Sequence, residues 1–293
     1  ILSGLVGSEM CIRDRGDAVS PTGRTRTAPA AGDMPGALRV AFASCQRWEH
    51  GHYAAWRHLA ADQPDLVLFL GDYIYEYATP KTTTDLARTH SLRHATTLAD
   101  YRDRYALHKS DPALQLAHAT CPWAVTWDDH EVQNDYAADA GRGEAAGSAA
   151  FLAQRSAAWQ AFYENMPLRA ASLERPVLDT RWDALQIYRR LRWGRLAHIH
   201  LLDSRQYRSW QACRTPDASS APAVRPADCA ELAQPQRSLL GSAQERWLDA
   251  GLAADTASAQ ATRWSVIAQQ TLFSPRHYPS GTCLLYTSDA ADE

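Results

Sequence analysis

The segment TWDDHEVQNDY gathers four carboxylates and an imidazole within eight positions, at Asp128, Asp129, His130, Glu131 and Asp135. It directly follows the apolar run CPWAV, which is typical of a buried strand. Carboxylates suit hard cations such as Ca²⁺, Mg²⁺ or Mn²⁺, and an uncharged imidazole beside them can hydrogen-bond to a substrate oxyanion. The alternative is a helix N-terminus whose acids complement the helix dipole. That alternative explains Asp129 and Glu131 but leaves His130 without a role.

Two other strand ends carry residues that could bind a metal. Asp72 in GDYIYEY follows an apolar run directly, and an aspartate there is placed to bridge two cations. Tyr75 could turn back toward the same centre, although a tyrosinate ligand needs a strongly polarising metal such as Fe³⁺. Cys45 in FASCQ could supply a thiolate. The alternatives are a turn residue at Asp72, a core aromatic at Tyr75 and a buried structural thiol at Cys45.

The segment HLLDSRQYR places Asp203 and Arg205 at a further strand end. An arginine offers a planar fork that matches a phosphate with two hydrogen bonds. A salt bridge between these two neighbouring residues is the alternative. We interpret the other histidines as surface or packing residues, because we find no partner at metal-ligand spacing for them.

These candidates depend on an alternation of strands and helices. Strands are predicted for residues 38–44, 65–72, 122–128 and 262–270, with a strand pair over 185–203. Helices are predicted for residues 52–62, 97–111, 112–120, 151–166 and 242–255. Such alternation indicates a layered α/β domain. Because ligand crevices of open α/β sheets lie outside the carboxyl ends of the strands, the candidate residues are expected to converge there.

Composition narrows the class of protein. The chain has 293 residues, of which 45% are apolar, and a formal charge of -3 with both signs interspersed. This balance argues against nucleic-acid binding through a basic surface. No apolar run is long enough to span a bilayer. The sequence gives no indication of the oligomeric state.

Both termini look foreign to the domain. LVGSEMCIRDR (5–15) and CLLYTSDAADE (283–293) resemble translations of sequencing adapters, so we exclude them from the fold. Residues 16–36 are rich in Pro, Gly, Thr and Ala and are typical of a linker. We therefore expect adapter sequence over 1–15 and 283–293, a linker over 16–36, and one domain over 37–282 that is cut at both ends.

Cys213 and Cys229 bracket a stretch rich in Pro, Ser and Ala. A disulfide that closes this loop is the favoured interpretation, and it implies an oxidising compartment. The alternative is two unpaired loop thiols.

Taken together, FASCQ, LVLFLGDYIYEY, VTWDDHEVQNDY, HIHLLDSRQYRS, LGSAQERWL and WSVIAQQTLFSP resemble the PhoD-type alkaline phosphatase family over about residues 36–276. The resemblance implies a four-layer α/β/β/α metallophosphatase sandwich. It also implies hydrolysis of phosphate mono- and diesters with Fe³⁺ and Ca²⁺. Members are typically exported through a twin-arginine signal, which this chain does not carry. GRTRTAPAAG (23–32) resembles the join to the family's N-terminal β-sandwich domain.

The resemblance also assigns roles to single residues. Cys45 and Tyr75 would bind the iron, and Asp72 would bridge iron and calcium. Calcium would be held by Asp129, together with Asp128 and Asn134. His130 would contact the phosphate, while Asp203 and Arg205 match a family motif, which makes Asp203 a further candidate ligand and Arg205 a candidate catalytic residue.

A further Gly-Asp-x-His-like ligand motif of the family is expected downstream of residues 262–270, and the chain does not reach it. We therefore expect the sandwich to be C-terminally incomplete and this chain to be impaired.

Two rival functions remain open. One is a Mn²⁺- or Zn²⁺-dependent phosphodiesterase on the same scaffold. The other is a non-catalytic secreted domain whose acids bind Ca²⁺ to stabilise folding. Cys45 and His130 argue against the second, because structural calcium sites use oxygen ligands.

Overall fold

The first of two sheets carries the strands that lead to the candidate residues. The computed structural model describes residues 14–15, 18–19, 22–81, 85–168, 182, 185–215, 226–256 and 261–271. β3 (Val40–Ala43), β4 (Leu66–Leu70) and β5 (Trp123–Thr126) pair in parallel in that order. Their carboxyl ends therefore meet at one edge of the sheet, as the sequence predicts.

The second sheet combines a hairpin with a parallel strand. β6 (Arg189–Trp193) pairs antiparallel with β7 (Ala197–Leu201), which pairs in parallel with β8 (Trp264–Ala268). The hairpin turn contains Gly194 at φ +54, a conformation that favours glycine. Further upstream, the short strands β1 (Asp14–Arg15) and β2 (Ala18–Val19) pair antiparallel with each other.

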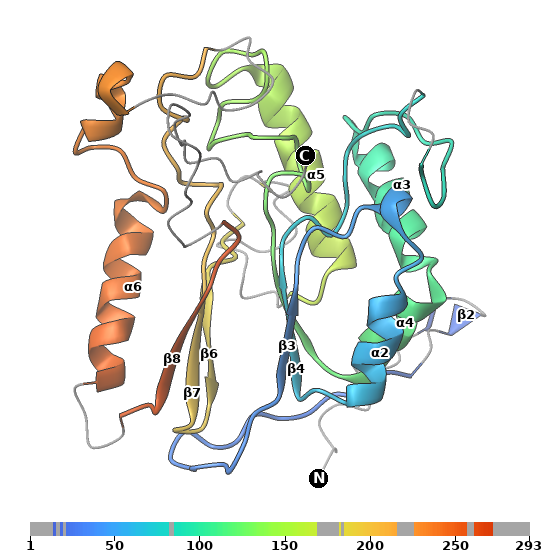
Figure 1. Ribbon diagram of the computed structural model, residues 1–293, viewed down its shortest axis with the longest axis vertical. Coiled ribbons are helices and arrows are strands. Elements are labelled where there is room, and N and C mark those ends of the chain that lie inside the picture. Colours follow the sequence, from blue (N-terminus) through green and yellow to red (C-terminus); the bar gives the residue numbers. More distant parts are fainter. Residues whose placement is uncertain are drawn as a thin grey trace.

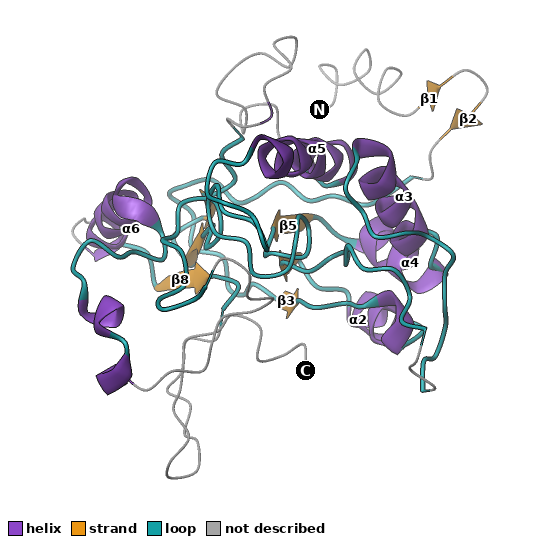
Figure 2. Cartoon of the chain, turned by 90° about the horizontal axis from the view of Figure 1, so that it is seen from above, coloured by secondary structure: helices purple, strands orange, loops and turns teal. Residues whose placement is uncertain are grey.

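Helices cover the outer faces of both sheets (Figure 1). The first sheet is covered by α2 (Ala54–Asp62), α3 (Leu98–Lys109), α4 (Pro112–Thr120) and α5 (Ala149–Asn165), which lie together on one side in Figure 2. The second sheet is covered by α6 (Gly241–Thr256). Short 3-10 helices are η1 (Trp48–His50), η4 (Pro226–Asp228) and η5 (Ala230–Ala233). Of the helices in the described ranges, none is both long and apolar enough to cross a membrane.

The unbroken apolar run of β4 is buried on both faces. Val67 and Phe69 belong to a cluster with α2, α3, α4 and α5 side chains. The alternate residues Leu66 and Leu68 pack against Ile199 and other side chains of the second sheet. The described residues thus lie in the order α6, second sheet, first sheet, and then the helices α2 to α5. The predicted α/β class is confirmed. The absence of apolar–polar alternation in β4 is explained by its burial on both faces.

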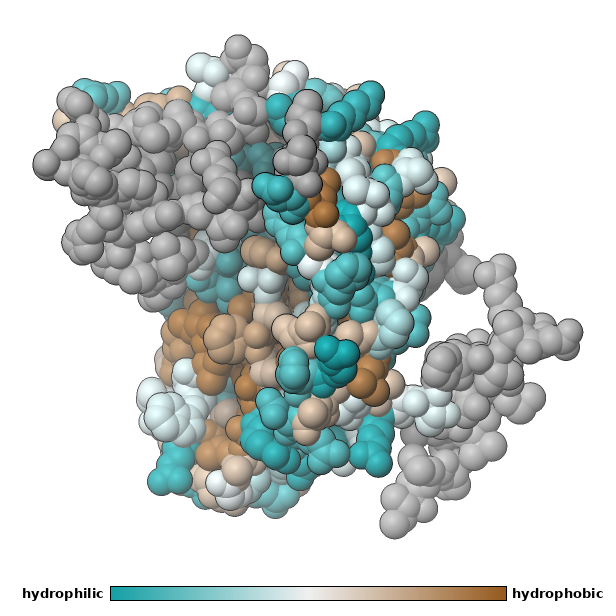
Figure 3. Space-filling model, turned by 45° about the vertical axis from the view of Figure 1, so that its right-hand side comes forward, coloured by the Kyte–Doolittle hydropathy of each residue, from teal (hydrophilic) through white to brown (hydrophobic). Residues whose placement is uncertain are grey.

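The two outer strands keep apolar side chains at the surface. Val40 and Phe42 of β3, and Trp264 and Ile267 of β8, are exposed, with Phe42 at 76%. Both strands lie at the edge of their sheets in the described part of the chain. Figure 3 shows an apolar area on the face that it presents.

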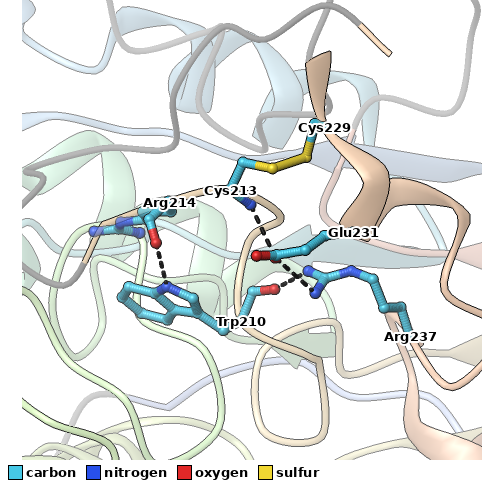
Figure 4. Close-up of a disulfide and its surroundings, with 6 residues drawn as sticks. All are labelled: Trp210, Cys213, Arg214, Cys229, Glu231 and Arg237. Carbon is cyan, nitrogen blue, oxygen red and sulfur yellow. Dashed lines mark hydrogen bonds and ion pairs between the residues drawn. A yellow bond between two sulfur atoms is a disulfide. The ribbon is translucent and has the colours of Figure 1, made fainter. Parts of the chain in front are cut away.

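The predicted disulfide between Cys213 and Cys229 is present, and it ties the segment after β7 to the segment before α6 (Figure 4). Around it, the Cys213 backbone N–H donates to Glu231 Oε2 at 3.0 Å, and the Arg237 guanidinium donates to the Trp210 carbonyl. The alternative of two free thiols at these positions is wrong.

We expect replacement of both Cys213 and Cys229 by serine to lower the free energy of unfolding by about 3 kcal/mol, because the bond closes a 16-residue separation in the unfolded chain. Urea denaturation of the oxidised protein, the reduced protein and the double variant measures the effect. The reduced wild type serves as the control and should match the variant. Equal stability of all three would contradict the expectation.

Candidate metal centre

Four candidate residues occupy the same position relative to their strands. Cys45, Asp72, Asp128 and Asp203 are each the second residue after the last residue of β3, β4, β5 and β7, respectively. Cys45 and Asp72 also share a left-handed backbone, with φ +57 at both. The Cys45 N–H donates to the Gly71 carbonyl at 3.1 Å, which holds these two strand ends together. The predicted convergence at the strand ends is therefore present.

Asp72 lies at the centre of one group of donor atoms. Its Oδ2 is 3.4 Å from Cys45 Sγ and 3.3 Å from the Tyr75 hydroxyl. Asp72 and Tyr75 are almost completely buried. Two ligand atoms that each lie about 2.0–2.3 Å from one metal ion are separated by about 3–3.7 Å. The thiol and the phenol therefore each stand at a separation from the Asp72 carboxylate that suits two ligands of one metal.

Asp129 and His130 join Asp72 in a second group of donors. One ligand atom from each of these three residues lies within 4.8 Å of the other two, and all three side chains are buried. The His130 backbone N–H also donates to Asp72 Oδ1 at 3.4 Å. Asp72 thus faces Cys45 and Tyr75 with one oxygen and the β5 loop with the other. This arrangement suits a carboxylate that bridges two cations.

The electrostatics of Asp72 also fit a bound cation. Burial raises the pKa of its carboxyl group well above the ordinary value, and the charges of Asp129, Asp128 and Glu131 raise it further, whereas His130 opposes the shift. A carboxylate in such surroundings is costly without a nearby positive charge. A metal held by these residues would supply that charge, so the donor set and its burial fit a metal centre.

Glu131 has a structural role that the sequence did not indicate. Its fully buried carboxylate accepts hydrogen bonds from the backbone N–H groups of Asp72 at 3.1 Å, Tyr73 at 2.6 Å and Asp128 at 2.8 Å. These hydrogen bonds link the segment after β4 to the segment after β5. Residues 129–135 form bends and turns. The alternative of a helix N-terminus at this segment is wrong.

Glu76 was also missed, and it orients His130. Glu76 Oε2 lies 2.7 Å from His130 Nδ1, and Oε1 accepts from the Asn134 N–H at 2.8 Å. Burial alone would raise the pKa of Glu76, but the interaction with His130 and the backbone hydrogen bonds together outweigh it and lower the pKa below its usual value. The His130 ring also lies 4.3 Å from the Tyr75 ring, centroid to centroid. The imidazole is thus fixed by contacts on its edge and on its face.

Arg205, which follows β7 of the second sheet, forms ion pairs with the acidic loop, residues 128–135, which follows β5 of the first sheet. Its Nε lies 2.5 Å from Asp128 Oδ1, and its Nη2 lies 3.1 Å from Asp129 Oδ1. The side chain is fully buried. Much of its guanidinium fork therefore faces carboxylates of this protein, and Arg205 supplies positive charge behind the candidate ligands.

Asp203 holds Arg205 in place rather than forming the predicted alternative of a side-chain salt bridge with it. Asp203 Oδ1 accepts hydrogen bonds from the backbone N–H groups of Arg205 at 3.0 Å and Gln206 at 2.9 Å. The Gln244 side chain of α6 binds both the backbone N–H and the carbonyl of Asp203, each at 2.8 Å. Asp203 is not part of the buried group of potential ligands formed by Asp72, Asp129 and His130.

A third set of potential ligands lies between β7 and α6. Asp255 contacts His198 Nδ1 at 2.5 Å and His200 Nε2 at 2.9 Å. Ser265 donates to the same carboxylate at 2.8 Å, and Arg190 Nε donates to His200 Nδ1 at 3.3 Å. With Nδ1 accepting from Arg190, His200 carries its proton on Nε2 and donates it to Asp255. A hydrogen-bond network therefore accounts for this set, and the local sequence does not show that the two histidines share a partner.

Gly71 allows the close approach of the two strand ends. It has φ +104, and a Cβ atom there would lie 2.5 Å from both Cβ and N of Asp128. We expect Gly71→Ala to displace Asp72 and lower kcat/KM by about 100-fold, because small misplacements of catalytic groups carry costs of that order. Steady-state kinetics measure this loss. Gly143→Ala is the matched control, since Gly143 has φ +70 but open space around it. Equal effects of the two variants would contradict the steric explanation.

Comparisons with known proteins agree with this geometry. The model of the family described as PhoD-like phosphatase matches residues 40–292. The chain is 42% identical over 280 residues to alkaline phosphatase D of Bacillus subtilis (strain 168). This alignment covers 94% of this chain and 44% of that protein. It also resembles the solved structure titled "Structure of PhoD" with a TM-score of 0.79 and 41% identity, over 94% of this chain and 49% of the other. The chain thus spans about half the length of these relatives.

Proposed function

This chain belongs to the PhoD-like phosphatase family, and we propose that it hydrolyses phosphate esters at the candidate metal centre. The observation that carries the proposal is the convergence of Cys45, Asp72 and Tyr75 on one side and of Asp129 and His130 on the other. No covalent intermediate on the protein is required. The substrates would be phosphate mono- or diesters.

The donor chemistry supports two different metals. Cys45 and Tyr75 offer a thiolate and a phenolate, which suit Fe³⁺, and Asp72 would be shared between iron and calcium. Asp129, Asp128 and Asn134 offer oxygen atoms, which suit Ca²⁺. When bound, these ions would polarise the phosphoryl group and lower the pKa of an attacking water. Asp203 would contribute indirectly, by positioning Arg205.

The protein's own groups would act on the charge of the phosphoryl group. Glu76 favours the protonated form of His130, because a carboxylate next to an imidazole stabilises the imidazolium. His130 could then donate a proton or a hydrogen bond to an oxygen of the ester. Arg205 would limit the repulsion between Asp128, Asp129 and an anionic substrate.

Glu76→Gln is expected to lower kcat/KM by about 10- to 100-fold, the usual effect of losing a carboxylate that orients a site histidine. The alkaline limb of the pH profile should also move to lower pH, because the imidazolium loses its partner. Kinetics across a pH series measure both effects. Glu164→Gln, which removes a carboxylate from an exposed pair with Arg102, is the control. An unshifted profile with full activity would rule out this role for Glu76.

Export of the native protein is supported by the disulfide, because such bonds persist in oxidising compartments.

Turnover of p-nitrophenyl phosphate and its bis-ester, before and after chelation, tests the proposal. We expect hydrolysis of at least one ester, its loss on chelation and its return with Fe³⁺ and Ca²⁺. Restoration by Mn²⁺ or Zn²⁺ alone would favour the rival phosphodiesterase. Calcium-dependent melting without any turnover would favour the non-catalytic domain and overturn the proposal.

A further inference from the structure

A pocket of about 320 Å³ opens between the segment after β7 and the segment before α6. Its polar lining comes from Arg208, Ser209, Gln211, Arg237 and Ser238, and none of the described residues that line it is acidic. The Ser209 N–H donates to the Ser238 carbonyl at 2.8 Å, and the Ser238 N–H donates to Ser209 Oγ at 3.1 Å. The disulfide joins the same two segments. The pocket is therefore a fixed, positively charged feature.

Arg208 is the unusual member of this lining. Its side chain is only 5% exposed, yet its Nε and Nη1 atoms make no hydrogen bond to the described residues. Burial lowers the pKa of Arg208 to about 10, so the guanidinium remains charged at neutral pH. A buried charge without a hydrogen-bonding partner is costly, and such a group calls for an explanation such as a catalytic role or a bound water or ion.

Two other arginines of the same segment do have partners in the acidic loop. Arg205 pairs with Asp128, and Arg214 Nη1 donates to the Asp135 carbonyl at 2.8 Å. Arg208 lies close enough to Asp128 and Asp135 to interact with their charges, but it forms no hydrogen bond with either. Arg208 therefore links the pocket to the acidic residues of the candidate metal centre, although none of the described lining residues is a candidate ligand.

We propose that this pocket binds an anionic group, a phosphate or a carboxylate, carried by the alcohol part of the substrate, with Arg208 as its ionic partner. The guanidinium fork matches either group with two hydrogen bonds. Arg237 of the opposite segment, which also pairs with Glu231 at 3.5 Å, supplies a second guanidinium. The inference rests on the proposed hydrolysis, and it predicts that esters with an additional anionic group are preferred over esters without one.

Binding of inorganic sulfate to the chelator-treated protein tests the pocket independently of turnover. Calorimetric titration should detect binding that Arg208→Gln weakens about ten-fold and Arg208→Lys weakens less, because lysine keeps the charge but not the fork. Arg102→Gln removes the same charge from an exposed pair and should leave the affinity unchanged. Equal affinity of the wild type and Arg208→Gln, or no binding to the wild type, would overturn the inference.

Hydrolysis of diesters that differ only in a terminal phosphate tests whether the anion bound in the pocket is part of the substrate. The probes are thymidine dinucleotides with and without a terminal phosphate on the 5′ or 3′ side. We expect the wild type to prefer a phosphorylated dinucleotide, and Arg208→Gln to reduce this preference about ten-fold, mainly through KM. Sulfate should inhibit the wild-type reaction more strongly with the phosphorylated probe.

An unchanged preference in Arg208→Gln would assign the pocket to a free anion and overturn the substrate subsite. If the wild type hydrolyses no ester at all, the proposed function fails and the substrate assignment fails with it. The sulfate titration would then still decide whether the pocket binds anions.

Discussion

Replacing Asp72 with asparagine is expected to lower kcat for phosphoester hydrolysis by about 10³-fold or more, because the variant loses the one carboxylate shared by both groups of donors. Asparagine is nearly isosteric with aspartate, but it cannot supply the negative charge that a bridging ligand shares between two cations. Turnover of p-nitrophenyl phosphate and metal content per chain, measured on the same preparation, give the result.

The stability of the metal-free variant provides the control for this substitution. Asp72 is buried beside Asp128 and Asp129, so removing its charge should not destabilise the metal-free fold. The metal-free variant should therefore melt at or above the temperature of the metal-free wild type. An active variant with full metal content would refute the bridging role of Asp72.

Arg205→Gln is expected to lower the free energy of unfolding by about 3–5 kcal/mol, the usual cost of leaving buried charges without their partner. The side chain is fully buried, and its fork contacts Asp128 and Asp129. Urea denaturation of the metal-free protein measures the loss. Arg102→Gln, which breaks an exposed pair with Glu164, should cost less than about 1 kcal/mol.

A double variant separates pairing from catalysis at Arg205. Asp128→Asn should recover part of the stability lost in Arg205→Gln, because it removes one of the carboxylates left unpaired. If Arg205→Gln instead retains its stability and raises only KM, the guanidinium serves the substrate phosphate and not the acidic loop.

The strands and the candidate ligands could be predicted from the sequence because both depend on local pattern. β4 is continuously apolar and β5 is apolar up to Thr126, and each strand is followed two residues after its end by an aspartate. A parallel sheet then brings Cys45, Asp72 and Asp128 to one edge without further information.

Glu76, Glu131 and the Asp255 network could not be predicted in this way. Glu76 reaches His130 across 54 residues, and Glu131 reaches the Tyr73 N–H across 58. Neither carboxylate differs in local sequence from an acid on a solvated loop. His198 and His200 share one face of β7, but their partner Asp255 comes from α6. Such long-range pairings follow from the packing of layers, which local sequence patterns do not encode.

The partners of Arg205 also could not be predicted from local sequence. Its position at a strand end was predicted, and a phosphate contact was the natural hypothesis for a forked cation there. The fold brings Asp128 and Asp129 from the other sheet against it, and the phosphate contact stays a prediction. Residue type and strand position could therefore locate Arg205, whereas its partners depend on how the two sheets face each other.

Anomalous X-ray scattering from crystals of the metal-loaded protein is the most direct test of an iron site formed by Cys45, Asp72 and Tyr75. Data collected at the iron edge should show a peak about 2.0–2.5 Å from Cys45 Sγ, Asp72 Oδ2 and the Tyr75 hydroxyl oxygen, at ordinary metal–ligand distances. A peak at His198, His200 and Asp255 instead, or an active protein with no peak at the strand ends, would contradict the proposed metal centre.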